Sequence, residues 1–147
     1  MPLMPGEEIS IINGLGRITH DDIMSRRTQP PLALSSMDGY AVRFSDVQEI
    51  PSKLTRVGSA PAGRAYPNAL NRNEAVRIFT GGPIPVGADT VVIQENVDAE
   101  SENDGANLQV NQQPTKGQYI RSAGLDFQTG ELGIKAVSYT HLRAHET

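Results

Sequence analysis

The sequence predicts an α+β fold that is mostly β, built from short strands joined by many turns. Among 147 residues there are 14 glycines and 10 prolines, a share typical of turn-rich β structure rather than of a helical bundle. From residue 40 onward, β-branched and aromatic residues alternate or cluster between the turn residues. Apolar residues recur at helical spacing only near the N-terminus, so one short helix is expected there.

That helix is predicted over residues 10–18, where apolar side chains recur three and four positions apart and Ser10 is available as an N-cap. Gly14 and Gly16 weaken it, each by roughly 1 kcal/mol relative to Ala. The dipeptide Pro30-Pro31 then requires an extended segment and marks a candidate domain boundary.

The remaining elements are predicted to be strands. The run at 90–93 is continuously apolar, as in a strand buried on both faces, whereas 107–111 alternates and should be half-exposed. Between them, the polar and acidic stretch 98–107 is expected to form a mobile hairpin loop. The predicted strands are 40–43, 53–57, 75–79, 90–93 and 107–111, with a final strand region that begins at 119–120.

Composition excludes several classes of function. The net charge is -4 without a basic run, so nucleic acids and membrane surfaces are not expected as partners. The chain has no cysteine, which rules out a disulfide, a thiolate nucleophile or a cysteine zinc site. The N-terminal residues lack the pattern of a secretory signal, and no stretch is long enough to span a bilayer. A cytoplasmic protein is therefore expected.

Two turns are the candidate site. The segment Ser35–Val42 sets the carboxylate of Asp38 on an Asp-Gly turn, and Thr80-Gly81-Gly82 places a hydroxyl beside two glycines whose N–H groups can converge on an anion. Together they suggest an anionic ligand with a metal ion. The alternative for both is a plain chain reversal, in which Asp38 caps its own backbone.

The order of these motifs resembles the MoeA family, the molybdopterin molybdenumtransferases, whose relatives include the E domain of gephyrin. The resemblance runs from about residue 8 to residue 135 and covers the N-terminal half of that family. Its motifs are Gly-Leu-Gly-Arg at 14–17, Ser-Ser-Met-Asp-Gly-Tyr-Ala-Val at 35–42, Val-Arg-Ile-Phe-Thr-Gly-Gly-Pro-Ile-Pro-Val-Gly-Ala-Asp at 76–89, Val-Val-Ile-Gln-Glu at 91–95 and Ile-Arg-Ser-Ala-Gly-Leu-Asp at 120–126.

The resemblance implies a β-rich lid domain inserted into a discontinuous, elongated α/β domain. Residues 1–29 and 117–136 then belong to the first domain, and residues 30–116 to the second. Residues 137–147 leave the family pattern and resemble translated sequencing adapter, so we expect them to be a non-native tail. His141 and His145 have a metal-ligand spacing but lie in that tail, and only His20 remains outside it.

The family reaction inserts molybdenum from molybdate into adenylylated molybdopterin and releases AMP. By resemblance, Asp38 and Thr80 are the catalytic residues, Asp38 is a possible Mg²⁺ ligand, and Gly81 and Gly82 bind the anionic substrate. Gly82 stands where relatives often carry Ala. The resemblance also implies a homodimer in the full-length protein, with an active site that two subunits share.

Two further positions match family motifs without a settled role. Arg121 and Asp126 either contact substrate or form an ion pair that holds the returning strand. Glu95, at the end of a predicted buried strand, is assigned a turn hydrogen bond in preference to a catalytic role.

The sequence leaves three functional hypotheses. The first is the N-terminal half of a molybdenumtransferase, inactive alone because the pterin-binding domain is missing. The second is a gephyrin-like scaffold or protein-interaction module, which the absence of a Pro-x-x-Pro tract and of an amphipathic partner helix disfavours. The third is an anion-binding β domain that works without the missing half.

Overall fold

The computed structural model describes residues 5–137, which form two compact units. Unit 1 comprises residues 5–29 and 126–137, and unit 2 comprises residues 30–125. The chain divides after Gln29 and again after Leu125, so residues 117–125 group with unit 2, and the assignment of these units to two domains of the family stays a prediction. The remainder of the expected tail, from residue 138 on, lies outside the described residues.

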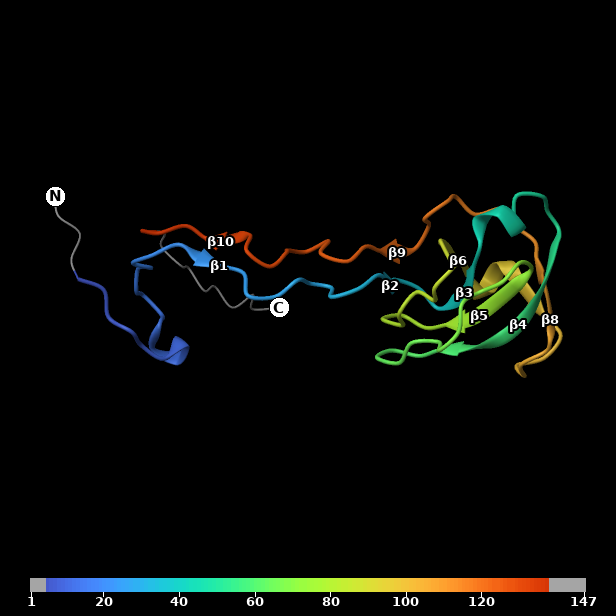
Figure 1. The fold of residues 1–147 in the computed structure, drawn as a ribbon, viewed down its shortest axis with the longest axis horizontal. Coiled ribbons are helices and arrows are strands. Elements are labelled where there is room, and N and C mark those ends of the chain that lie inside the picture. The colour runs from blue at the N-terminus through green and yellow to red at the C-terminus, as the bar shows by residue number, and fades with distance from the viewer. Residues whose placement is uncertain (1–4, 138–147) are drawn as a thin grey trace. The chain divides into compact units, whose positions relative to one another are not determined.

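Unit 2 is built on one six-stranded sheet, in the order β6-β3-β5-β4-β8-β7 (Figure 1). All neighbouring strands are antiparallel except β4 and β5, which run parallel. A separate two-stranded ladder pairs β2 with β9. The strands are β2 (Leu34–Ser35), β3 (Gly39–Val42), β4 (Ser52–Ala60), β5 (Glu74–Ile78), β6 (Thr90–Ile93), β7 (Val97–Ala99), β8 (Asn107–Val110) and β9 (Ile120–Arg121).

The strands carry two apolar clusters, one on each face of the sheet, because successive side chains of a strand point to opposite faces. In β3, Tyr40 and Val42 belong to one cluster and Ala41 to the other. In β6, Val92 and Val91 divide in the same way, so this strand is buried on both faces as its continuous apolar run predicts. The mostly β fold predicted from the sequence is confirmed.

The predicted helix over 10–18 is wrong. The chain forms only a single 3-10 turn there, η1 (Ile11–Asn13), and the described residues contain no α-helix. Gly14 caps this turn, and Gly16 has φ +75°, a left-handed conformation that ends any helix. Two glycines within three positions therefore outweigh the apolar spacing.

The expected loop over 98–107 is partly wrong as well. Its first residues extend the strand β7, which pairs with β8 through Asp98↔Gln109 and Ala99↔Leu108. Only the residues between these two strands form the connecting loop. Two other 3-10 turns, η2 (Phe44–Asp46) and η3 (Gln94–Asn96), follow β3 and β6.

Unit 1 has little secondary structure of its own. Its two segments meet in an antiparallel pair of β1 (Ile23–Met24) with β10 (Leu132–Ile134), and Gln29 bridges to Phe127. Several of its apolar side chains are exposed: Ile11 is 89% exposed, Ile12 85% and Leu15 73%. The described part of the chain has no helix with the length and hydropathy that crossing a membrane requires.

Replacing Ile11 and Ile12 together by Ser should leave the melting temperature unchanged, because neither side chain is buried. Exposed apolar side chains grouped on one segment favour association, so the variant should also be less prone to self-associate. Thermal unfolding and sedimentation velocity measure the two effects. A fall of several degrees in melting temperature would contradict the exposure of η1.

Candidate functional site

Asp38 and Thr80 lie in direct contact, although 42 positions separate them in the chain. The backbone N–H of Thr80 donates to Oδ1 of Asp38 at 2.8 Å, and the Thr80 hydroxyl donates to the same oxygen at 2.9 Å. We call this pair the Asp38–Thr80 clasp. Both residues are exposed, so the clasp faces solvent.

The sheet topology explains why the two residues meet. Asp38 immediately precedes β3, and Thr80 follows β5 by two residues. These strands are antiparallel with Gly39 opposite Ile78, so the start of one lies beside the end of the other. Since β6 also pairs with β3 through Ile93 opposite Gly39, the clasp lies where three strand ends meet.

Hydrogen bonds fix the loop that leads into Asp38. The Ser35 hydroxyl donates to the carbonyl of Met37 at 2.6 Å and accepts from the Met37 N–H at 3.3 Å. Both the N–H and the hydroxyl of Ser36 donate to the carbonyl of Tyr119, at 2.9 and 3.1 Å. Tyr119 holds this position with φ +59°, unusual for a residue other than glycine.

Position 39 requires glycine because the backbone of β6 lies too close for a Cβ atom, and not because the chain adopts a left-handed conformation there. Gly39 is absent from the residues with positive φ, in contrast to the usual role of glycine in an Asp-Gly turn. A Cβ at this position would overlap the carbonyl oxygen of Val92 and lie 2.9 Å from Cα of Ile93. Glycine therefore lets β3 lie tightly against β6 directly beside Asp38.

The two glycines after Thr80 do not present free N–H groups, contrary to the expected anion cradle. Gly81 N–H donates to the carbonyl of Ser35 at 2.8 Å, and Gly82 N–H donates to that of Phe79 at 2.7 Å. Gly81 adopts φ +79°, and a Cβ on Gly82 would overlap the carbonyl of Ala60. Here the glycines allow a tight turn that aims Thr80 at Asp38, so substrate contact by their N–H groups would require those bonds to open.

The clasp lowers the pKa of the Asp38 carboxyl. The hydrogen bond from the Thr80 N–H is the largest cause and that from the Thr80 hydroxyl the next, while burial opposes them slightly and the positive charge of Arg77 assists. Hydrogen bonds donated to a carboxylate favour its ionised form. Asp38 is therefore an exposed, ionised and oriented carboxylate at neutral pH.

Arg77 is a residue that the sequence reasoning missed. It lies on β5 opposite Tyr40 of β3, and its guanidinium lies 5.3 Å from the centre of the Tyr40 ring and 4.8 Å from that of Phe79. It donates to the Gly39 carbonyl at 2.9 Å and to Oε1 of Gln94 at 2.6 Å. In the sequence, Arg77 stands out only as a charged residue between the apolar positions Val76 and Ile78, which are buried in the fold. Its closeness to Asp38 follows only from the strand register.

The other predicted residues fall in both units. Arg121 ends β9, opposite Leu34 of β2, within unit 2. Asp126 belongs to unit 1, where its N–H donates to the carbonyl of Gln29 at 2.9 Å. Glu95 is exposed in η3. Substrate contact by Arg121 and Asp126, and the turn hydrogen bond of Glu95, stay predictions.

The clasp offers one carboxylate to a metal ion. Both hydrogen bonds that Asp38 accepts from Thr80 fall on Oδ1. Within residues 5–137, no three His, Cys, Asp or Glu side chains gather closely enough to hold a metal by themselves. A single ionised carboxylate suits Mg²⁺, which keeps several waters and is completed by substrate phosphates. The residues present therefore fit a shared metal site and not a closed protein cage.

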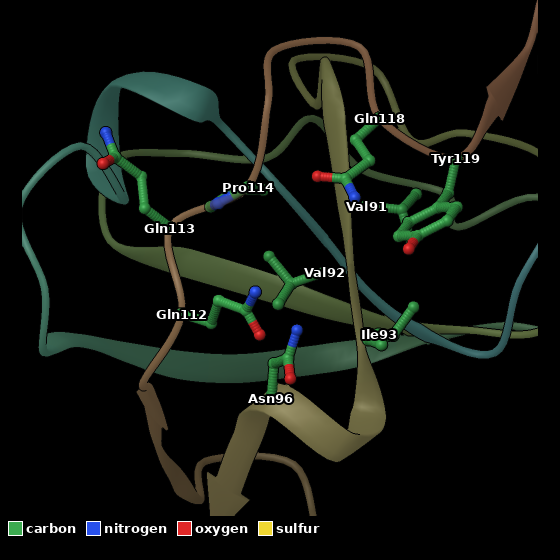
Figure 2. A pocket seen from close by; sticks show the side chains of 9 residues that line it. All are labelled: Val91, Val92, Ile93, Asn96, Gln112, Gln113, Pro114, Gln118 and Tyr119. Atoms are coloured by element: carbon green, nitrogen blue, oxygen red, sulfur yellow. The ribbon is translucent and has the colours of Figure 1, made fainter.

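Unit 2 also has two hollows whose lining does not include Asp38 or Thr80. The first, beside the outer edge of β6, measures about 30 Å³, room for about one water molecule, and amide side chains surround it (Figure 2). The second is an open hollow of about 430 Å³ beside Tyr66 and Arg64. The lining of the first is Val91, Val92, Ile93, Asn96, Gln112, Gln113, Pro114, Gln118 and Tyr119.

Replacing Thr80 by Ala should raise the pKa of Asp38 toward its ordinary value of about 3.9. The rise should be incomplete, because the Thr80 N–H, the larger cause, remains. Since the folded-state pKa lies below the unfolded one, the clasp stabilises the fold above about pH 4, and this contribution is lost as the pH falls through the lowered pKa. Carboxyl ¹³C NMR titration of Asp38 measures the shift.

Thr80→Ser is the matched control, because it keeps a hydroxyl at the same place and should leave the pKa of Asp38 low. An unchanged pKa of Asp38 in Thr80→Ala would show that the hydroxyl does not donate to the carboxylate in solution.

Comparison with known proteins identifies the family to which this chain belongs. The family model of the MoeA N-terminal region, domains I and II, matches residues 1–146. A molybdopterin molybdenumtransferase of Haemophilus influenzae is 35% identical over 129 residues, which cover 88% of this chain and 31% of that protein. The corresponding enzyme of Nostoc sp. is 36% identical over 119 residues, covering 78% of this chain and 26% of the relative.

A solved structure shows the same fold. The crystal structure of the molybdopterin biosynthesis MoeA protein of Pyrococcus horikoshii OT3 matches with a TM-score of 0.78 and 29% sequence identity. The match covers 88% of this chain and 34% of that one. The chain thus spans only 26–34% of the length of these three proteins.

Proposed function

We propose a function from one premise: this chain belongs to the family of the MoeA N-terminal region. On that premise the chain is the N-terminal part of a molybdopterin molybdenumtransferase. The whole protein would insert molybdenum from molybdate into adenylylated molybdopterin and release AMP. This chain would supply a lid that carries Asp38 and Thr80, and the pterin-binding part would lie elsewhere in a longer protein.

The observation that carries this proposal is the Asp38–Thr80 clasp. An exposed carboxylate with a lowered pKa, held by two hydrogen bonds, is suited to position a cation or a polar substrate group. The reactants are anions or carry phosphate, so management of negative charge dominates the chemistry. Asp38 would be the residue that holds a Mg²⁺ ion, whose positive charge, when bound, would offset negative charge of the substrate phosphates.

The clasp alone is too open to enclose a substrate. Both residues of the clasp are exposed to solvent. A second surface must therefore complete the site, and we propose that it is the pterin-binding part of a partner subunit in a homodimer. The exposed apolar side chains of η1 in unit 1 support a chain that packs against further protein.

The test is direct molybdenum insertion by the full-length protein. Purified protein, adenylylated molybdopterin and molybdate should yield AMP and molybdenum cofactor, and omission of molybdate should suppress the product. The 147-residue chain alone should release no AMP and should bind AMP no more tightly than about 1 mM. Micromolar binding by this chain would favour a self-sufficient anion-binding domain, and an inactive full-length protein would overturn the assignment.

A further inference from the structure

Arg77 contacts residues at the three strand ends that meet at the clasp. It projects from β5, donates to the carbonyl of Gly39 on β3, and donates to the side chain of Gln94 just after β6. Its guanidinium also lies over the rings of Tyr40 and Phe79. A planar group with several donors can make such contacts at the same time, which an ammonium group cannot.

These contacts hold the backbone immediately C-terminal to the Asp38 side chain. The carbonyl of Asp38 accepts from the N–H of Gln94 at 3.2 Å, and the Gln94 side chain is held by Arg77. The carbonyl of the next residue, Gly39, is held by Arg77 directly. The guanidinium therefore fixes the backbone from which the Asp38 carboxylate projects, without a hydrogen bond to that carboxylate.

We propose that Arg77 is a positioning residue, which holds the Asp38–Thr80 clasp in one orientation through Gly39 and Gln94. This role in the reaction rests on the proposed function, whereas the geometry that it maintains does not. A purely structural arginine would stabilise the sheet as a whole. A positioning arginine should in addition determine whether the Thr80 N–H reaches the carboxylate of Asp38.

The test compares Arg77→Lys with Gln94→Ala in the 147-residue chain. Lysine keeps the charge but loses the planar pair of donors, and Gln94→Ala removes one anchor at an exposed side chain. Because Asp38 accepts from the Thr80 N–H, the amide resonance of Thr80 should shift as Asp38 titrates. Arg72→Lys, at an exposed turn, is the matched control.

We expect the pH-dependent shift of the Thr80 amide to be lost in Arg77→Lys, reduced in Gln94→Ala and retained in Arg72→Lys. If Arg77→Lys does not fold, Gln94→Ala decides the question alone. In the full-length protein, Arg77→Lys should lower kcat about tenfold or more, with KM little changed, because misplacement by about 1 Å is costly.

A lowered melting temperature with an unchanged Thr80 amide titration in Arg77→Lys and Gln94→Ala would overturn the proposal and leave Arg77 a structural residue. The NMR outcome needs no catalytic activity. An inactive full-length protein with a normal Arg77 effect on Thr80 would therefore refute the proposed function and not the positioning role.

Discussion

Replacing Asp38 by Asn in the full-length protein should reduce molybdenum insertion about a hundredfold or more. The amide keeps the shape of the side chain and an oxygen that accepts from Thr80, but it removes the negative charge that a cation requires. Folding should change by less than about 1 kcal/mol, because the side chain is exposed. AMP release in the presence of molybdate measures the activity, and thermal unfolding measures the stability.

Asp21→Asn is the matched control, since the Asp21 side chain is 87% exposed and lies in unit 1. It should leave insertion unchanged. Normal turnover in Asp38→Asn at normal stability would reduce Asp38 to a turn residue and remove the main support for the proposed site.

The shared-site proposal has its own experiment. One inactive full-length variant carries Asp38→Asn, and a second carries a substitution in the pterin-binding part. If two subunits build each site, mixed dimers contain about one intact site, so activity should return on mixing. Continued inactivity, in a preparation where subunit exchange is demonstrated, would show that each subunit uses its own Asp38.

Replacing Gly39 by Ala should have the largest effect on stability, a loss of at least about 3 kcal/mol. The added Cβ would overlap the Val92 carbonyl, and its other close neighbours are backbone atoms of β6 that cannot rotate aside. The strand pair β3–β6 would have to separate at the end that carries Asp38. Chemical denaturation should show the loss, with a melting temperature lower by more than about 12 °C.

Gly105→Ala separates steric overlap from backbone conformation. Gly105 has φ +91°, and a Cβ added there would meet no atom within 4 Å. Alanine at this position therefore incurs only the left-handed penalty of about 1–2 kcal/mol. A loss in Gly39→Ala no greater than that in Gly105→Ala would mean that β3 and β6 separate at little cost.

The strands were predictable because local pattern decides them. Runs such as 90–93 and 107–111 match β6 and β8 closely, since burial and alternation leave a direct signature in sequence. The helix predicted over 10–18 does not form. The spacing of apolar residues indicates only which side chains could share a helix face, whereas Gly14 and Gly16 determine the backbone conformation there.

The contacts of the candidate site could not be predicted from the sequence. Motif resemblance singled out Asp38 and Thr80, but their hydrogen bonds depend on the register of β3 against β5, which sequence does not display. The same register places Arg77 opposite Tyr40, two residues after Asp38. The sequence predicts that the N–H groups of Gly81 and Gly82 bind an anion, because it displays these donors but not the backbone carbonyls that accept from them in the fold.

The pairing of β2 with β9 brings the first and last segments of unit 2 side by side (Figure 1). Closer still to the boundary, the N–H of Gly124 donates to the carbonyl of Pro30 at 2.8 Å. A module whose entry and exit touch can be gained, exchanged or excised in evolution without rerouting the chain that hosts it. For the same reason, residues 30–125 could be circularly permuted across this junction with a linker of only a few residues, and the cassette that carries Asp38 and Thr80 would remain whole.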